Sequence, residues 1–340
     1  MEIQAALARL AESKDLSQQE TREVFQQVMS GKTTPAQIGG LLMAMRVKGE
    51  SAEEIAGAAE TMRMLSTRVE VKADYLVDTC GTGGSGKNLF NISTAAAFVA
   101  AAAGAHVAKH GNRKMTSASG SADVLEAAGV NLALTPSQIA QCIAEVGVGF
   151  LFAQTHHSAM RHAASVRQEL GVRTMMNVLG PLTNPAGAKR QVIGVFSPVW
   201  QARLAEVLKL LGAEHVLIVH SNGLDEIALD GATFVVELKK DATTSFEIRP
   251  EDFGIEPRSM TELQANSPET SLALVKQALT EPDSAAADIV SLNAGAAIYT
   301  AGVATSLENG VTMAQDAIAA GLANERLEEL VRISKLMGEA

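Results

Sequence analysis

The amino-acid sequence predicts an α/β protein, in which a small N-terminal helical domain precedes a large domain with a mainly parallel central sheet flanked by helices. From Tyr75 onward, short apolar strands alternate with helical segments, as in parallel sheets with helical crossovers. The region before it shows only helical patterns. With 340 residues, 47% of them hydrophobic, the chain is long enough to bury a hydrophobic core in each of two domains. We therefore expect a helical domain at residues 1–70 and an α/β domain at residues 71–340.

The N-terminal region contains three recognisable helix starts. A segment at residues 20–29 has helical spacing, with Ser17 or Thr21 as its candidate cap. A second helix begins at Pro35, because proline is favoured in the first turn. A third begins at Ser51, which opens a capping-box pattern. No cluster of catalytic residue types occurs here, so these helices are expected to serve packing and oligomerisation.

The larger region alternates between strands and helices in a regular order. Strands are predicted at residues 76–79, 105–108, 149–153, 191–196 and 215–220, with a later antiparallel pair at 233–238 and 245–248. Helices are predicted at residues 95–103, 121–128, 136–146, 159–170, 199–211, 285–301 and 312–320, and from about 324 onward. This order predicts a mainly parallel sheet with helices on its faces.

A glycine-rich loop follows the first predicted strand. Its glycines are Gly81, Gly83, Gly84 and Gly86. Without side chains, these residues let backbone N–H groups approach a ligand closely. An alanine-rich helix then begins near Asn91, Ser93 and Thr94. Because a helix N-terminus carries unpaired N–H groups and partial positive charge, this segment is expected to bind an anion such as phosphate.

A second polar loop follows the next strand. Its polar residues are Lys109, His110, Asn112, Arg113, Thr116, Ser117, Ser119 and Ser121. Consecutive parallel strands end at the same edge of a sheet, and ligands of open α/β sheets bind outside those ends. The two loops together are therefore expected to form the core of an active site.

Residues 81–87 also fit the G-x-x-x-x-G-K pattern of nucleoside triphosphatases. That motif requires a following Ser or Thr whose hydroxyl holds Mg²⁺, and Asn88 stands at this position. The helix also does not begin at once after the lysine. Both departures argue against a nucleoside triphosphatase.

Composition excludes other classes of protein. The formal net charge is −10 and no basic block occurs, which argues against a nucleic-acid-binding function. No uninterrupted apolar run of about 18 residues marks a membrane span, and the N-terminus lacks a signal-peptide core. The two cysteines, Cys80 and Cys142, provide no disulfide framework. We therefore expect a cytoplasmic protein without a membrane or nucleic-acid partner.

Several motifs resemble those of the anthranilate phosphoribosyltransferase family. They are GTGG, NIST, KHGNR and SGSAD in this order, followed by RTMMNVLGPLTNPAG (173–187), GLDEI (223–227), RPEDFGI (249–255) and LNAGAAIYTAG (292–302). The resemblance covers essentially the whole chain. It implies transfer of the phosphoribosyl group of 5-phosphoribosyl 1-pyrophosphate (PRPP) to the amine of anthranilate in tryptophan biosynthesis. It also implies a homodimer whose interface lies in the helical domain.

The same resemblance implies three sets of site residues. For PRPP they are Gly81, Gly83, Gly84, Ser85, Asn91, Ser93, Thr94, Lys109 and Ser121. For anthranilate they are Gly81, His110, Asn112, His157, Arg167, Gly180 and Pro181. For the cofactor Mg²⁺ they are Ser93, Asp225 and Glu226. The carboxylate pair follows a predicted strand and turn, and Mg²⁺ binds through one or two carboxylates plus substrate phosphates.

Arg167 is expected about two turns after His157 on one helix, and a guanidinium can bind a carboxylate with two hydrogen bonds. His156 and His157 are adjacent on that predicted helix and would not face one another, so we reject them as a metal-binding pair.

The implied reaction needs little covalent chemistry from the protein. The aromatic amine is already a nucleophile, and pyrophosphate leaves readily once its charge is neutralised. We therefore expect catalysis by positioning and electrostatics, without a covalent intermediate. No catalytic general base is evident; His110 is a weak candidate, and water is the alternative.

The sequence departs from the family pattern at four positions. Ser85 replaces an aspartate of the usual GTGGD loop, and the loss of this carboxylate is expected to ease anion binding and to weaken the organisation of Mg²⁺. Ser158 and Ser165 stand where proline is common, and Met176 stands where phenylalanine is common. These three changes are expected to alter loop stiffness and packing rather than the type of reaction.

Two alternative functions remain open. A pyrimidine-nucleoside phosphorylase would share the fold but typically carries KHSSR, so Gly111 and Asn112 argue against it. A non-enzymatic nucleic-acid-binding paralogue is opposed by the acidic charge balance and by the presence of Arg167, Asp225 and Glu226.

Overall fold

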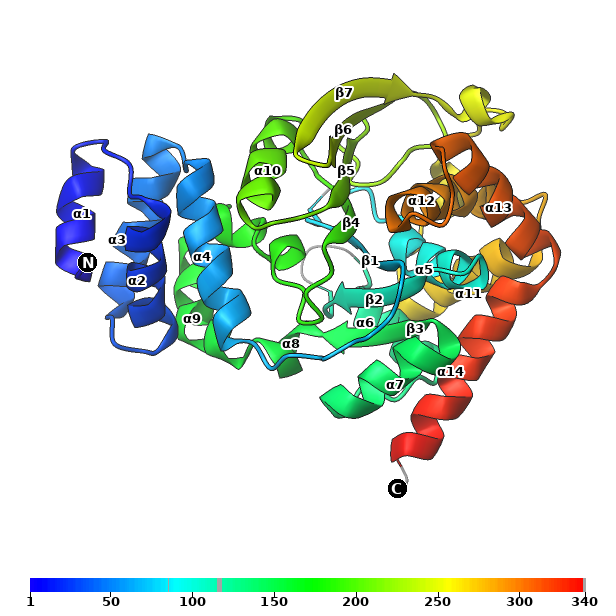
Figure 1. The fold of residues 1–340 in the computed structure, drawn as a ribbon, viewed down its shortest axis with the longest axis horizontal. Coiled ribbons are helices and arrows are strands. Elements are labelled where there is room, and N and C mark those ends of the chain that lie inside the picture. The colour runs from blue at the N-terminus through cyan, green and yellow to red at the C-terminus, as the bar shows by residue number, and fades with distance from the viewer. Residues whose placement is uncertain (85, 115–117, 339–340) are drawn as a thin grey trace.

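The computed structural model describes residues 1–84, 86–114 and 118–338. Its N-terminal helices gather at one end of the molecule (Figure 1). They are α1 (Ile3–Ala11), α2 (Gln18–Met29), α3 (Pro35–Lys48) and α4 (Ala52–Leu65). Ser17, Thr34 and Ser51 cap α2, α3 and α4 by accepting a hydrogen bond from the backbone three residues on. Ser17 is therefore the cap of α2, whereas Thr21 lies inside that helix.

The described residues form one seven-stranded sheet in the order β3-β2-β1-β4-β5-β6-β7. Its strands are β1 (Leu76–Gly81), β2 (His106–Gly111), β3 (Val148–Phe152), β4 (Arg190–Gly194), β5 (His215–His220), β6 (Thr233–Lys239) and β7 (Ala242–Ile248). The first five are parallel, and β6 and β7 pair antiparallel. The predicted fold class and the antiparallel pair are confirmed.

The sheet is buried on both faces. Along β5, Val216 and Ile218 join the core beneath the N-terminal helices, whereas Leu217 and Val219 join the core on the opposite face. This alternation follows from the two-residue period of a strand. A parallel sheet needs both faces covered, and the continuous apolar run of β5 meets that need.

Helices from distant parts of the sequence cover the two faces (Figure 1). One face carries α5 (Ile92–Ala102), α6 (Ser121–Ala128), α11 (Pro268–Thr280), α12 (Ala285–Ala301), α13 (Leu307–Ala319) and α14 (Leu322–Gly338), with α7 (Pro136–Val146) beside β3. The other face carries α10 (Val199–Leu210), which packs on α4, and α9 (Arg161–Leu170), which packs on α2 and α3. None of the helices within the described residues is both long and apolar enough to cross a membrane.

Two sequence-based expectations about helices need correction. The helix predicted at residues 159–170 is α9, and it is separated from α8 (Ala153–His156) by a 3₁₀ turn at Ser158–Met160. His157 has φ −117° and ψ 53°, so it is not helical and does not share a helix with Arg167. Helix α11 was not predicted, although Ser267 caps it and Pro268 begins it.

The order of the strands positions the functional site. β1 has β2 on one side and β4 on the other, so the chain reverses its direction of travel across the sheet at β1. A crevice forms at such a switch point because the loops leave the strand ends toward opposite sides. The glycine loop follows β1 directly and therefore lies at this crevice.

Candidate active site

A cavity of about 290 Å³ opens at the carboxyl ends of β1, β2, β4 and β5. Its lining comes from the glycine loop, the start of α5, the end of β2 with the start of α6, and the segment after β5. A larger depression of about 530 Å³ lies beside α11 and α12. That depression contains none of the predicted site residues, so the cavity at the strand ends is the candidate site.

The glycines of the site allow the segment that contains Asp225 to pack against β1 and β4. A Cβ atom at Gly81 would lie 2.6 Å from Asp225 Oδ2, and one at Gly194 would overlap the Asp225 carbonyl oxygen. Gly83 donates its backbone N–H to Asp225 Oδ2 at 2.8 Å. Close approach of the backbone is therefore the reason for glycine at positions 81 and 194.

Lys109 supplies a buried positive charge at the base of the cavity. Its side chain is 3% exposed, and its Nζ donates a hydrogen bond to the Thr79 carbonyl. Asp78 lies below it, fully buried, and accepts the backbone N–H of His110 at 3.1 Å. Burial raises the pKa of Asp78, and the Lys109 charge opposes that rise. A buried ammonium group of this kind suits a phosphate ligand.

Asp225 and Glu226, in the segment after β5, add two carboxylates to the lining of the cavity. Burial is the largest effect that raises the pKa of Glu226, and repulsion from Asp225 raises it further. The charge of Lys109 and hydrogen bonds from the backbone and hydroxyl of Ser93 lower it. Within the described residues, no group of three or more His, Cys, Asp or Glu side chains could hold a metal ion. A metal here would thus depend on this carboxylate pair, Ser93 and phosphate oxygens, a donor set that suits Mg²⁺. Asp225, Glu226 and Ser93 fit Mg²⁺, because a cation would relieve the electrostatic repulsion between the two carboxylates.

Two helix N-termini point to the same cavity. Asn91 precedes α5, and its side-chain oxygen accepts hydrogen bonds from Ser119 at 2.8 Å and Ser271 at 2.7 Å. Ser121 begins α6, and its Oγ lies 3.4 Å from the Asn112 carbonyl. A Cβ atom at Gly111 would overlap that Oγ. Ser93 of α5 and Ser121 of α6 both line the cavity, so the N-termini of two helices lie beside it, which favours an anion.

Two histidine rings lie on the third side of the site. The rings of His110 and His157 meet edge to face, with centroids 5.1 Å apart. Burial holds the pKa of His110 well below its usual value and lowers the pKa of His157 to about 4. Within the described residues, His110 Nε2 and both ring nitrogens of His157 lack a hydrogen bond of normal geometry, although the Thr183 backbone lies close. Both rings are therefore neutral near pH 7.

Arg167 is a half-buried cation on α9. Burial lowers the pKa of its guanidinium, and it makes no ion pair with any carboxylate among the described residues. It does not line the cavity. Gly180 and Pro181 form the 3₁₀ turn at Gly180–Leu182, whose backbone contacts His110. His110 therefore separates the cavity from His157 and this turn.

The structure brings most of the predicted site residues together. Those that line the cavity are Gly81, Gly83, Gly84, Asn91, Ser93, Lys109, His110, Asn112, Ser121, Asp225 and Glu226. Those outside its lining are Thr94, His157, Arg167, Gly180 and Pro181. Ser85, Thr116 and Ser117 lie outside the described residues. His156 binds the Thr67 carbonyl through Nδ1 at 2.6 Å, away from the cavity lining.

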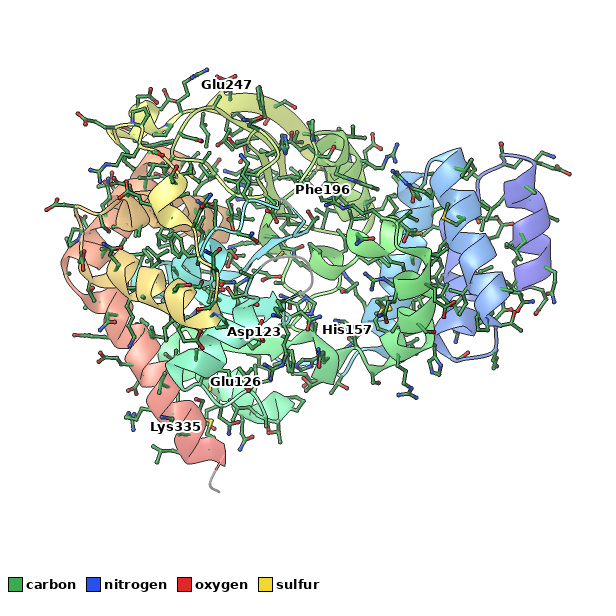
Figure 2. All side chains as sticks on the ribbon, turned by 180° about the vertical axis from the view of Figure 1, so that it is seen from behind. Asp123, Glu126, His157, Phe196, Glu247 and Lys335 are labelled. Atoms are coloured by element: carbon green, nitrogen blue, oxygen red, sulfur yellow. The ribbon has the colours of Figure 1, made fainter. Side chains whose placement is uncertain are left out.

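Among the lining residues that sequence reasoning missed are Arg173, Asn177 and Phe196. Arg173 and Asn177 lie in the RTMMN motif, which served as a family match without a role for its side chains. Phe196 follows β4 at the switch point. Figure 2 shows Phe196 and His157 on the side of the sheet nearer the N-terminal helices.

A helical bundle joined to an α/β domain, with a cavity at the strand ends, is the architecture of one class of transferases. Residues 4–66 match the model of the helical bundle domain of the glycosyl transferase family, and residues 73–324 match that of its a/b domain. Within this class, the chain belongs to the anthranilate phosphoribosyltransferase family.

Individual relatives are similar to this chain over almost their whole length. The chain is 56% identical to the anthranilate phosphoribosyltransferase of Teredinibacter turnerae over 99% of this chain and 100% of that protein. It is also 56% identical to the anthranilate phosphoribosyltransferase of Hahella chejuensis, over 100% of this chain and 99% of that protein. Among solved structures, the enzyme of Thermus thermophilus has a TM-score of 0.92 and 45% identity, covering 97% of this chain and 99% of that one. The Saccharomyces cerevisiae enzyme in complex with PRPP and Mg has a TM-score of 0.88 and 25% identity, with 98% coverage of both chains.

Proposed function

We propose that this protein transfers the phosphoribosyl group of PRPP to the amine of anthranilate, giving N-(5-phosphoribosyl)anthranilate and pyrophosphate for tryptophan biosynthesis. One observation carries the proposal: a buried lysine, a glycine loop and two helix N-termini converge on a cavity that a carboxylate pair closes. The names of relatives 56% identical to this chain support the same reaction.

PRPP has a 5′-phosphate and a pyrophosphate, so its site must balance several negative charges. We assign this role to Lys109, to the backbone N–H groups of the glycine loop and to the two helix starts. The proposed PRPP-binding residues are Gly81, Gly83, Gly84, Ser85, Asn91, Ser93, Thr94, Lys109 and Ser121. Ser93, Asp225 and Glu226 would hold Mg²⁺ together with phosphate oxygens.

Anthranilate is a flat ring with a carboxylate and an amine. Arg167 supports a carboxylate-binding role, because it is a half-buried guanidinium without an acidic partner among the described residues. The neutral rings of His110 and His157 offer flat surfaces and hydrogen-bonding nitrogens without adding charge. The proposed anthranilate-binding residues are Gly81, His110, Asn112, His157, Arg167, Gly180 and Pro181.

The reaction is a displacement at C1 of the ribose. The amine nitrogen forms the new C–N bond while the C1–O bond to pyrophosphate breaks, and the amine proton leaves to solvent. Bound Mg²⁺ would supply charge neutralisation of the leaving pyrophosphate. Lys109 and the loop N–H groups stabilise the charge that develops on the departing oxygen. Because burial holds the pKa of His110 well below its usual value, its ring is a weak base, and positioning is the main contribution of this side of the site.

The same proposal includes three properties of the whole molecule. The boundary between the helical domain and the α/β domain lies between residues 70 and 71. The helical domain forms the interface of a homodimer. The protein works in the cytoplasm, where its two buried cysteines, Cys80 and Cys142, remain reduced.

The test is the loss of anthranilate fluorescence when purified protein receives PRPP and Mg²⁺. Turnover that needs every component, and that collapses in Arg167→Ala, supports the proposal. Phosphorolysis of a pyrimidine nucleoside, or salt-dependent DNA binding without turnover, would replace it with one of the two alternative functions. A wild-type protein that binds both substrates without turnover would place the defect at Ser85.

A further inference from the structure

Arg173 connects the glycine loop to the segment after β4. Its Nη2 donates a hydrogen bond to the Gly84 carbonyl at 2.7 Å, and its guanidinium carbon lies 4.0 Å from the centre of the Phe196 ring. Phe196 in turn donates its backbone N–H to Thr82 Oγ1 at 3.3 Å. One side chain therefore reaches the loop at two points, directly through Gly84 and indirectly through Phe196.

Arg173 differs from Arg113, which also lines the cavity, in whether its charge is paired with carboxylates. Arg113 forms ion pairs with Asp123 at 3.2 Å and Glu126 at 2.7 Å. Arg173 has no ion pair with any carboxylate among the described residues, although it is exposed and lines the cavity. A guanidinium has five N–H donors, and the structure assigns one of them to the Gly84 carbonyl. The charge of Arg173 is thus available to the cavity.

The loop residue opposite Arg173 must be glycine for two reasons. Gly84 has a φ of +85°, which residues with a side chain adopt with strain. A Cβ atom at this position would also lie 2.7 Å from Arg173 Nη2. The positive φ therefore requires glycine at this position, and a side chain would also displace the guanidinium from its present place.

The glycine loop is held on two sides. On one side, Gly83 donates its N–H to Asp225 Oδ2 at 2.8 Å, and Thr82 donates its N–H to the Gly194 carbonyl at 2.9 Å. On the other side, Arg173 binds the Gly84 carbonyl. These contacts fix the backbone of Thr82, Gly83 and Gly84 from both sides of the loop.

We infer that Arg173 is a positioning residue for PRPP: its guanidinium, stacked on Phe196, holds the glycine loop in the conformation that receives the pyrophosphate end of the substrate. This inference rests on the proposed function. The role needs the planar guanidinium, because an ammonium group cannot stack on the ring and reach the carbonyl in the same way.

The experiment compares steady-state kinetics of Arg173→Gln, Arg173→Lys and Phe196→Leu with the wild type. We expect Arg173→Gln to raise the KM for PRPP about tenfold or more, while the KM for anthranilate changes less than about twofold. Arg173→Lys keeps the charge but should recover only a small part of the loss. Phe196→Leu should raise the KM for PRPP in the same direction, because it removes the stacking surface.

Arg203→Gln is the matched control. Arg203 also lies over an aromatic ring, 5.6 Å from the centre of Trp200, but neither residue lines the cavity. This control should keep both KM values of the wild type. Thermal unfolding of each variant separates a lost fold from a lost binding function.

Three outcomes would overturn the inference. They are an unchanged KM for PRPP in Arg173→Gln, equal rises in both KM values, and full recovery in Arg173→Lys. If the wild type shows no turnover, the proposed function fails instead, and calorimetric binding of inorganic pyrophosphate still tests Arg173. Equal pyrophosphate affinity of wild type and Arg173→Gln would then refute its role, and an affinity loss of about tenfold would support it.

Discussion

The buried ring of His157 makes the stability of the protein depend on pH in acid. His157 is 7% exposed, and burial lowers its pKa to about 4 in the folded state, against an ordinary value of 6.5. Above pH 6.5 the ring is neutral in both states and contributes nothing. As the pH falls, the unfolded state binds a proton first, so stability is lost between pH 6.5 and about 4.

The magnitude follows from these two values. At about pH 5, the unfolded ring is mostly protonated and the folded ring mostly neutral, which costs about 2 kcal/mol of unfolding free energy. His157→Asn removes this term. We therefore expect the variant to lose about 2 kcal/mol less than the wild type between about pH 7.5 and pH 5.

Urea unfolding followed by the fluorescence of Trp200, the single tryptophan, measures the difference. Trp200 is 7% exposed in the core that the N-terminal helices share, so its emission reports the loss of packing in that core. His106→Asn is the control, since its ring binds the Asp74 carbonyl at 2.8 Å near the opposite end of the sheet. Equal pH-dependent losses in His157→Asn and the wild type would refute the reasoning.

Two further predictions concern the packing and the charge of the site. Gly194→Ala places a methyl group on the Asp225 carbonyl oxygen, so urea unfolding should show a loss of about 1–3 kcal/mol together with lost turnover. Gly231→Ala, where no atom lies within 4 Å, should stay within about 0.5 kcal/mol of the wild type, and equal effects would contradict the packing argument. Lys109→Met should raise the KM for PRPP about tenfold or more, because it removes a charge-assisted contact. Lys87→Met should leave that KM nearly unchanged, because Lys87 does not line the cavity. The opposite ranking of the two variants in the same assay would contradict the assignment of Lys109 to PRPP.

Much of the candidate site could be predicted because its parts are local. The glycine loop, the start of α5 and the residues after β2 each lie within a few residues of a strand end. Their spacing along the chain therefore determines which edge of the sheet they share. The carboxylates Asp225 and Glu226 were found for the same reason, because they follow β5 and a turn.

The remaining parts depend on contacts between distant segments. The break at His157 was missed, because the segments before and after it, α8 and α9, are both helical. Arg173 was missed because its partners, Gly84 and Phe196, are far from it in the sequence. No pattern within one segment indicates which carbonyl or ring a long side chain will reach.

The sequence by itself determined the local structure: caps such as Ser51 begin helices, apolar runs form strands, and glycines mark close approaches of the backbone. These features depend on interactions between residues a few positions apart, so spacing along the chain encodes them. Only the tertiary structure decided that β4 pairs beside β1, that Asp225 reaches Gly83, and that α9 packs with the N-terminal helices. The physical reason is that strand order and helix placement are selected by burial of both sheet faces at once, a property of the whole chain rather than of any segment.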